Sequence, residues 1–310
     1  MSDPQVGAEG VVMRPARRGD LAAIESIASR TWNGRDYLID VVDAWIDDPT
    51  GEFVVAEVDG KVAGTVKVSR LGQARWWLEA CRVDPDARER GLGRELMRFA
   101  VVRAGELQTS EGGTGVMGAV VDESNVPSLR ILTSIGFVEL VRFTRCVAAC
   151  ESTSGVSDFH VLDAVDVDRA VEFVDHSELV AVAAGTQSHR PVGVTLDRQS
   201  VSALIDARRL YGWSGVRHEP QRLDGLLAVG DISTGARSLS ITYLDAPGEL
   251  VSIASGTRSL GAALGATTVE HLLQADPARV ASMLRARWRR PAGLNLSVMV
   301  AREIGAEQAV

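Results

Sequence analysis

The amino-acid sequence predicts an α/β protein of the mixed (α+β) class, built from two domains that follow one another along the chain. A chain of 310 residues with 45% hydrophobic content can bury two cores of ordinary size. Segments with strand and helix periodicity alternate along its first half. A Ser/Gly-rich stretch, residues 149–158, then precedes a segment whose pattern is similar to the start of the chain, which indicates a repeated fold.

The first half is expected to contain a flexible N-terminus at residues 1–10 and a first domain at 11–150. Asp20 lies near the start of the first predicted helix, Asp48-Pro49 ends the second, Asp59-Gly60 is typical of a hairpin turn, and Gly136 ends the last helix. The predicted elements are a strand at 11–16, helices at 17–32 and 36–49, strands at 51–58, 61–72 and 74–85, a helix at 93–108, a strand at 115–125, a helix at 126–136 and a strand at 137–149.

The second half, residues 151–310, is predicted to be a degenerate copy of the first. Residues 159–179 align with residues 11–31, so that Ala164 and Asp168 correspond to Ala16 and Asp20. The predicted elements that follow are strands at 223–233, 237–245 and 249–256, helices at 260–274 and 278–290, and a strand at 294–303.

The composition excludes several classes of function. A formal net charge of −8 and a pI near 5.3 argue against a nucleic-acid partner, which usually needs a basic face. No apolar run approaches the roughly 20 residues of a membrane helix. The three cysteines, Cys81, Cys146 and Cys150, are an odd number without a signal peptide, so we expect reduced thiols in the cytoplasm. No metal site is predicted, because no second Cys or His pair has ligand spacing.

A charged turn before the helix at 93–108 is the first candidate site. It has the pattern Arg-x-x-Gly-x-Gly from Arg88 to Gly93, and Arg90 and Arg94 add further positive charge. A helix N-terminus has unpaired N–H groups and partial positive charge, and glycines let its backbone approach a ligand closely. The turn therefore suits a pyrophosphate group. The alternative is a solvated helix start, with glycine for the turn and arginine for solubility.

This turn, the strand before it and the later segment 125–137 (NVPSLRILTSIGF) together resemble the GNAT family of acyl-CoA-dependent N-acyltransferases over residues 11–149. The resemblance implies a central mixed, splayed sheet and acetyl-CoA as cosubstrate, with no metal. It assigns the pantetheine arm to Cys81, Arg82 and Val83, and it places Asn125 and Ser128 beside the coenzyme. It assigns the pyrophosphate to Arg88, Glu89, Arg90, Gly91, Leu92, Gly93 and Arg94.

Glu79 is the candidate general base, because amide formation needs a neutral amine and a carboxylate with a raised pKa can take the proton. Strand alternation predicts that Glu79 shares a face with Trp77, Cys81 and Val83, where bulky neighbours would desolvate it. The alternative is an ordinary glutamate on the solvent side of a strand.

The sequence also departs from the family. Many members have a tyrosine in the helix after the asparagine that protonates the leaving thiolate, and Leu132 stands at that place here. Tyr37 is the nearest substitute by analogy, although a core or hydrogen-bonded structural role is the favoured alternative. Water is a further alternative, because thiolate is a good leaving group.

A narrower resemblance connects the segments Gly34–Leu38 and Leu78–Val83 with larger GNAT proteins that include free-histidine acetyltransferases, although Ile39 replaces their proline. It implies a small amino acid or amine as acceptor, with Asp36 reading its ammonium or a side chain and Arg82 reading a carboxylate. Tyr37 and Trp77 are further candidate substrate residues. Alternatively, Asp36 and Arg82 belong to ion pairs.

Two features of the second half remain open at the sequence level. Arg258–Ala263 (RSLGAA) matches the glycine turn without its arginines, which favours a structural helix start over a second coenzyme site. Tyr211, Trp213 and His218 either close over the acceptor or pack the domains.

Three classes of function follow. The first is an acetyl-CoA-dependent N-acetyltransferase that acts on a small amine or amino acid, as a monomer or homodimer without nucleic-acid or membrane partners. The second is a protein or peptide N-acetyltransferase. The third is a non-catalytic acyl-CoA-binding protein.

Overall fold

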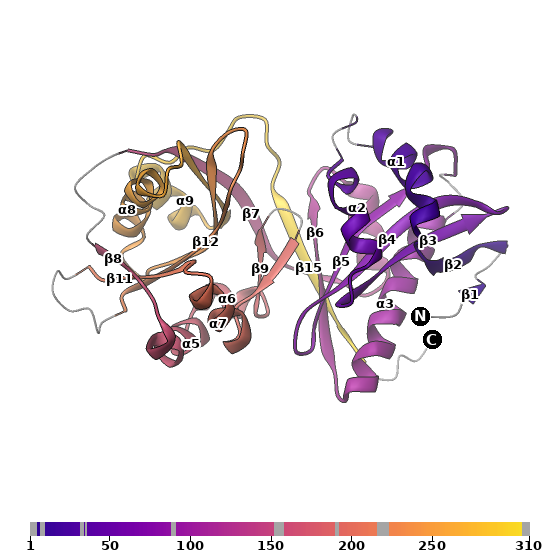
Figure 1. The fold of residues 1–310 in the computed structure, drawn as a ribbon, viewed down its shortest axis with the longest axis horizontal. Helices are drawn as coiled ribbons and strands as arrows, with labels where there is room; N and C mark the ends of the chain where they lie inside the picture. The colour runs from indigo at the N-terminus through magenta and orange to yellow at the C-terminus, as the bar shows by residue number, and fades with distance from the viewer. Residues whose placement is uncertain are drawn as a thin grey trace. The chain divides into compact units, whose positions relative to one another are not determined.

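The computed structural model describes residues 5–6, 10–31, 34, 36–87, 91–151, 158–189, 192–215 and 223–305. The chain divides into two compact units. Unit 1 comprises residues 1–119, 125–138 and 300–310, and unit 2 comprises residues 120–124 and 139–299. The alternation of strands and helices in both units confirms the predicted mixed α/β class (Figure 1). The domain boundary near residue 150 stays a prediction.

The sheet of unit 1 has the strand order β1-β2-β3-β4-β5-β6, in which all neighbours are antiparallel except β5 and β6. Asp59 and Gly60 both have positive φ, 51° and 72°, which suits the tight hairpin turn predicted between β3 and β4. The strands are β1 (Gln5–Val6), β2 (Val12–Pro15), β3 (Gly51–Val58), β4 (Lys61–Gly72), β5 (Arg75–Val83) and β6 (Gly115–Asp122).

The N-terminus differs from the prediction of a flexible segment, because Gln5 and Val6 pair with β2 as a short antiparallel strand. Backbone hydrogen bonds along an edge strand can hold even a polar terminus, and polarity alone does not report them.

Two groups of helices cover the two faces of this sheet (Figure 1). The apolar sides of α1 and α2 pack with Phe53, Val55 and Ala80 in one core, and α3 packs with its Leu92 and Leu96 close to Gly64 on the other face. The helices are α1 (Leu21–Ser29), α2 (Leu38–Ile46), α3 (Leu92–Glu111) and α4 (Val126–Ser134). The first-half elements predicted from periodicity are therefore present up to the last strand, which is β7 (Val138–Ala149).

A β-bulge interrupts β5 at Ala80. The register with β4 shifts there, because Lys67 pairs with Glu79 whereas Thr65 pairs with Arg82. Ala80 is buried and has φ of 53°, an uncommon value for a residue with a side chain. The buried Thr65 hydroxyl donates to the Ala80 carbonyl oxygen at 2.9 Å and holds the bulge in place.

The sheet of unit 2 has the order β7-β14-β13-β12-β11-β8, with β13 and β14 parallel and the other described pairs antiparallel. A separate hairpin joins β9 (Thr186–His189) to β10 (Val192–Thr195). The sheet strands are β8 (Phe159–Val161), β11 (Leu210–Trp213), β12 (Gly225–Ile232), β13 (Ser238–Asp245) and β14 (Thr268–Gln274), and β15 (Ser297–Ile304) ends the described chain.

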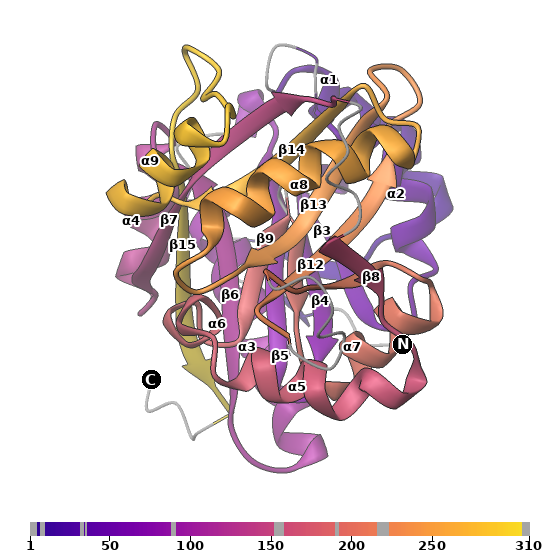
Figure 2. The ribbon, with the colours of Figure 1, turned by 90° about the vertical axis from the view of Figure 1, so that its left-hand side faces the viewer.

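The two faces of this sheet carry separate cores. One core contains Ile253 and Ala254 of α8 together with Met283 of α9, and Figure 2 shows α8 lying across β13 and β14. The other core joins Ala170 of α5 and Val201 of α7 to Tyr243. The helices are α5 (Val167–Asp175), α6 (Glu178–Val182), α7 (Arg198–Asp206), α8 (Leu250–Ala263) and α9 (Pro277–Arg285).

Two elements predicted in unit 2 are wrong. The segment 249–256 is not a strand but the start of α8, and its buried residues Leu250, Ile253 and Ala254 have helical spacing. The segment 260–274 is not one helix. It contains the end of α8, a break at Gly265 with φ of 87°, and β14. Strands buried on both faces lack alternation, so their apolar runs are easily mistaken for helix.

The internal repeat is present, with a corrected alignment. A strand, a 3₁₀ turn and a helix follow one another in β2, η2 (Arg18–Asp20) and α1, and again in β8, η6 (Ala164–Asp166) and α5. The Asp20 carboxylate accepts from the Arg17 amide, and the Asp166 carboxylate accepts from the Asp163 amide, each immediately before its helix. Asp20 therefore corresponds to Asp166 and not to Asp168. The sequence comparison placed the copies two positions out of register.

None of the helices in the described ranges combines the length and apolar character required to cross a membrane.

Thr65→Val tests the bulge. The substitution keeps the shape of the side chain and leaves the buried Ala80 carbonyl without its donor, so we expect the free energy of unfolding to fall by about 1–2 kcal/mol in urea denaturation. Thr242→Val, at a half-buried strand position in unit 2, is the matched control and should change stability by less than about 0.5 kcal/mol. Equal effects in both variants would contradict a stabilising role of the Thr65 hydroxyl.

Candidate functional site

The parallel pair β5 and β6 is splayed. Its register covers only Arg75, Trp76 and Trp77 of β5, opposite Val116, Met117 and Gly118. From Leu78 to Val83 the β5 edge that faces β6 has no ladder partner in the described part of the chain. Backbone amide and carbonyl groups on such an edge can pair with an extended, amide-containing ligand.

Glu79 lies on β5 just beyond the last pair with β6. Only 7% of its surface is exposed, and the Ser69 hydroxyl donates to its Oε1 at 2.9 Å. Its second oxygen, Oε2, is buried without a hydrogen-bond partner. Burial raises the pKa of Glu79 to about 7, against smaller lowering effects from Ser69 and Lys67. A half-satisfied carboxylate with this pKa can accept a proton near neutral pH.

The β5 bulge corrects the predicted surroundings of Glu79. Because one extra residue is inserted at Ala80, Cys81 and Val83 point to the opposite face, toward α3. The Cys81 thiol lies 3.9 Å from the Gly93 carbonyl oxygen, and Val83 faces the same residue. Arg82 takes the place beside Glu79 that simple alternation assigned to Cys81. Trp77 does share the face of Glu79, but it is fully buried and supports the strand from within.

Lys67 and Ser69 are functional neighbours that the sequence analysis missed. Lys67 is paired in register with Glu79, and its fully buried ammonium contacts the Asp48 carboxylate and lies 5.9 Å from the centre of the Trp45 ring. A lysine and a serine at alternating positions of an otherwise apolar strand, VKVS, were the available signal.

Asp36 and Arg82 form a buried, bidentate ion pair. Nε and Nη2 of Arg82 donate to the two oxygens of Asp36 at 2.6 and 3.0 Å, and the Thr31 hydroxyl and the Leu38 amide also donate to Asp36. Burial opposes ionisation of Asp36, but these bonds outweigh it and lower the pKa of the carboxyl. Each charge therefore already has a partner within the chain. This agrees with the alternative role in the sequence analysis, in which Asp36 and Arg82 belong to ion pairs.

Tyr37 lies beside this ion pair. The Arg82 guanidinium carbon is 5.7 Å from the centre of its ring, and the ring makes an edge contact with Trp45. Burial, together with the negative charge of Glu79, raises the pKa of Tyr37 to about 12. The phenol thus keeps its proton at neutral pH and can act as a donor.

Helix α3 begins directly after Gly91, which has φ of 74°. Helix geometry leaves the amide groups of Leu92 and Gly93 outside the intrahelical pattern. A Cβ at Gly93 would lie 3.6 Å from Val83 and 3.7 Å from Ile131, so this position is accessible from the end of β5. Arg94 is exposed in the first turn. Arg88, Glu89 and Arg90 lie outside the described residues.

Asn125 and Ser128 have a local role in α4. Asn125 is the N-cap residue, and its side chain accepts from the Ser128 amide at 3.3 Å. Leu132, which replaces the tyrosine of the family pattern, is 1% exposed and packs in the core. No hydroxyl is available at that place.

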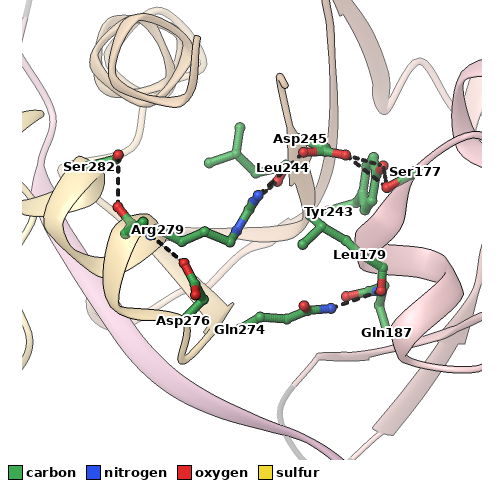
Figure 3. A network of polar contacts seen from close by, with 11 residues as sticks. Ser177, Leu179, Gln187, Tyr243, Leu244, Asp245, Gln274, Asp276, Arg279 and Ser282 are labelled. Atoms are coloured by element: carbon green, nitrogen blue, oxygen red, sulfur yellow. Dashed lines mark hydrogen bonds and ion pairs between the residues drawn. The ribbon is translucent and has the colours of Figure 1, made fainter. Parts of the chain in front are cut away.

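Unit 2 has a second splayed pair of parallel strands, in which other side chains stand at the positions that correspond to the candidate site. The pairing of β13 with β14 ends at Ile241, so Tyr243 is the counterpart of Glu79. Burial raises the pKa of Tyr243, whose hydroxyl donates to the Ser177 oxygen at 2.9 Å. Nη2 of Arg279 donates to the Leu244 carbonyl at 3.2 Å, and thereby occupies the open strand edge (Figure 3).

The remaining candidates in unit 2 are structural. Arg258–Ala263 is not a helix start but the last part of α8, and the buried Arg258 donates to the Ala149 carbonyl at 3.0 Å. Tyr211 and Trp213 are buried in the core of unit 2 on β11, whereas His218 lies outside the described residues.

The comparisons agree with this geometry. The sequence model of the acetyltransferase (GNAT) family matches residues 21–137. No curated protein matches the sequence.

Three solved structures share the fold. A GCN5-related N-acetyltransferase from Sphaerobacter thermophilus has 13% identity and a TM-score of 0.63, with 94% of this chain and 95% of that chain covered. A tandem GNAT protein of the clavulanic acid biosynthesis pathway has 14% identity and a TM-score of 0.58, with 94% and 98% covered. A GCN5-related glucosamine N-acetyltransferase region of a fungal multi-domain GH3 β-N-acetylglucosaminidase has 12% identity and a TM-score of 0.65, with 96% and 38% covered.

The burial of Glu79 predicts a pH-dependent cost in stability. Its pKa rises from 4.5 to about 7 on folding, so the folded protein holds this proton more tightly, and stability is lost as pH rises from about 4.5 to 7. Glu79→Gln removes this penalty. Relative to the unsubstituted protein, the variant should gain on the order of 2 kcal/mol between pH 5 and pH 8.5 in urea denaturation. Glu25→Gln, at an exposed glutamate, is the control, and a pH-independent difference for Glu79→Gln would contradict the raised pKa.

Proposed function

Because residues 21–137 of this chain belong to the acetyltransferase (GNAT) family, we propose that the protein transfers an acetyl group from acetyl-CoA to the primary amine of a small amine or amino acid. The chain carries an N-acetyltransferase domain, and the acceptor is the new part of the proposal. The single observation that carries the catalytic assignment is the buried, unpartnered Oε2 of Glu79 at the splayed strand.

The coenzyme is proposed to bind along the open edge of β5 and at the start of α3. The unpaired backbone of Cys81, Arg82 and Val83 suits the amides of the pantetheine arm. The amide groups of Leu92 and Gly93, together with Arg94 and the positive end of the α3 dipole, suit the pyrophosphate. The proposed pyrophosphate site also includes Arg88, Glu89, Arg90 and Gly91. Asn125 and Ser128 cap α4, whose Ile131 lies beside Gly93 at this turn.

Glu79 is proposed to remove the proton from the acceptor ammonium through Oε2. Ser69 fixes the other oxygen, so the orientation of the carboxylate is set before the amine arrives. With a pKa of about 7, roughly half of the Glu79 carboxyls are ionised at neutral pH. Once Glu79 has taken a proton, it releases that proton readily to water. The neutral amine then attacks the acetyl carbonyl of acetyl-CoA, and the C–S bond breaks. The second proton of the nitrogen passes to Tyr37 as Tyr37 gives its own proton to the thiolate.

Tyr37 is the proposed proton donor for the leaving thiolate in place of the residue lost at Leu132. Its phenol is protonated at neutral pH and lies on the Glu79 side of the sheet, where the charge of Glu79 acts on it. Asp36 supports this arrangement indirectly, since it holds Arg82 against the Tyr37 ring.

A recessed base favours a slim primary amine as acceptor. Glu79 is almost fully buried, so a primary amine on a small molecule would reach Oε2 more readily than a bulky or secondary amine. The fungal relative is described as a glucosamine N-acetyltransferase region, which is an example of a small amine acceptor on this fold. We further propose a cytoplasmic enzyme, active as a monomer or homodimer, with domains at 11–150 and 151–310.

An acceptor screen with free-thiol readout tests the substrate class. Turnover with small amines or amino acids supports the proposal. Turnover only with peptides would replace it by protein or peptide acetylation, and acetyl-CoA binding without any turnover would indicate a non-catalytic protein.

Glu79→Gln should lower kcat by roughly 10²- to 10⁴-fold, because the amide keeps the shape and removes the basicity. The affinity for acetyl-CoA should change little. In the unsubstituted enzyme, the rate should rise with pH through about 7 as Glu79 loses its proton, and this limb should vanish in the variant. A loss below about threefold at every pH would assign the proton to another group. Loss of coenzyme binding together with rate would indicate that Glu79 only shapes the strand.

Gly93→Val should weaken acetyl-CoA binding by about tenfold or more, because its side chain covers the amide groups at the start of α3. A Cβ at this position meets Val83 and Ile131 only at ordinary contact distance, so the variant should fold. Gly105→Ala, farther along the same helix, is the control. Unchanged affinity in folded Gly93→Val would contradict the assignment of the pyrophosphate to this turn.

Since Arg279 occupies the corresponding edge of unit 2, calorimetry should give one acetyl-CoA site per chain.

A further inference from the structure

A pocket of about 340 Å³ lies in unit 2, outside the site described above. The C-terminal half of α5 and His176 border it on one side, and Asp245 and Pro247 at the end of β13 border it on the other. Phe173, Leu223 and Pro247 make much of its wall apolar. The pocket ends on the buried network of Ser177, Tyr243 and Asp245 (Figure 3).

The internal repeat identifies the counterpart of this pocket in unit 1. Arg30 follows the last residue of α1 as His176 follows the last residue of α5. Both side chains bond to a carbonyl oxygen one turn back: Nε of Arg30 donates to Ser26 at 3.3 Å, and Nδ1 of His176 donates to Glu172 at 2.8 Å. The two side chains therefore leave their helices in the same direction.

The next residue confirms this correspondence. Thr31 donates its hydroxyl to the Asp36 carboxylate, and Ser177 donates its hydroxyl to the Asp245 carboxylate at 2.8 Å. An arginine completes each set, Arg82 in unit 1 and Arg279 in unit 2. In both copies the hydroxyl after the helix thus meets a carboxylate that also contacts an arginine, although non-equivalent elements supply the carboxylate and the arginine.

In unit 1 the chain fills the space itself. The Arg30 guanidinium reaches from α1 to the segment after β5 and forms ion pairs with Asp84 and Asp86 at 2.5 and 2.9 Å. In unit 2 the shorter His176 bonds to the Glu172 carbonyl of its own helix and lines the pocket.

The charges around the pocket suit a cation. Glu172 has no ion-pair partner among the residues that the structure describes. Asp245 is 3% exposed, and the ion pair that its Oδ1 forms with Arg279 is long, at 3.5 Å. Among the described lining residues, the arginine is Arg169, which is paired with Asp166 at 2.6 Å. Phe173 adds an aromatic ring, which attracts cations.

We propose that this pocket binds a small organic cation with a guanidinium head and a short apolar body, which takes the place that Arg30 fills in unit 1. The guanidinium would lie between Glu172 and Asp245, and its alkyl chain would lie against Phe173, Leu223 and Pro247. Planar guanidinium groups match carboxylates better than ammonium groups do, because their N–H donors are fixed in a fork.

Calorimetric titration of the full chain with propylguanidinium chloride tests the proposal. Saturable binding at one site with a Kd of about 1 mM or tighter is expected. Propylurea, which has nearly the same shape and no charge, should bind at least about tenfold more weakly. No saturable binding, or equal binding of both compounds, would overturn the proposal.

Two substitutions locate the site. His176→Arg should fill the pocket with the chain's own guanidinium, abolish propylguanidinium binding and leave the melting temperature equal or higher. Glu172→Gln should weaken binding by about fivefold or more, and it covers the case in which His176→Arg does not fold. Asp175→Asn, which removes a neighbouring exposed charge outside the pocket, is the control. Glu79→Gln should not change binding, and a loss there would instead place the cation in the acceptor site.

Discussion

The hydrogen bond from Thr65 to the Ala80 carbonyl holds the feature on which the candidate site depends. It stabilises a bulge in β5, with Ala80 in a left-handed conformation that a residue with a side chain adopts only when its surroundings impose it. From Arg75 to Trp77, β5 pairs with both neighbours. From Leu78 onward it keeps its pairing with β4 and has no partner on β6. The bulge also decides which side chains lie together, because it turns Arg82 toward Glu79 and turns Cys81 and Val83 toward α3. One inserted residue thus decides which side chains lie on the face of the proposed proton transfer and which lie on the face that meets the start of α3.

Three buried charges on this side of the sheet differ in how completely they are satisfied. Asp36 accepts from Arg82, Thr31 and the Leu38 amide, and its pKa is low. Lys67 is fully buried but contacts Asp48. Glu79 has a single donor on one oxygen and none on the other. An unsatisfied buried carboxylate lowers the stability of the fold. Glu79 has such an unsatisfied oxygen, whereas hydrogen bonds satisfy Asp36. This contrast supports the proposed proton transfer at Glu79, whereas Asp36 holds Arg82 in place.

The second unit repeats the geometry with other residues. Tyr243 stands where Glu79 stands, and its raised pKa prevents it from acting as a base near neutral pH. Arg279 donates to the strand edge that is open in unit 1. The splayed pair thus recurs in both units, whereas Tyr243 stands in place of the proposed base, which is consistent with function depending on individual sites rather than on the fold.

The sequence by itself determined the order of elements in the first half, the hairpin at Asp59-Gly60, the glycine turn before α3 and the identity of Glu79 as a recessed carboxylate. These depend on local signals, namely periodicity, turn residues and spacing. It failed at the start of α8, where the helical spacing of Leu250, Ile253 and Ala254 was mistaken for a strand, and at β14, where burial on both faces removes the alternation typical of a strand. Only the tertiary structure decided that Asp36 pairs with Arg82, that Ser69 and Lys67 flank Glu79, and that Cys81 and Val83 face away. The physical reason is that the bulge at Ala80 depends on Thr65 of a neighbouring strand, and a register shift between strands leaves no mark in the alternation of either one.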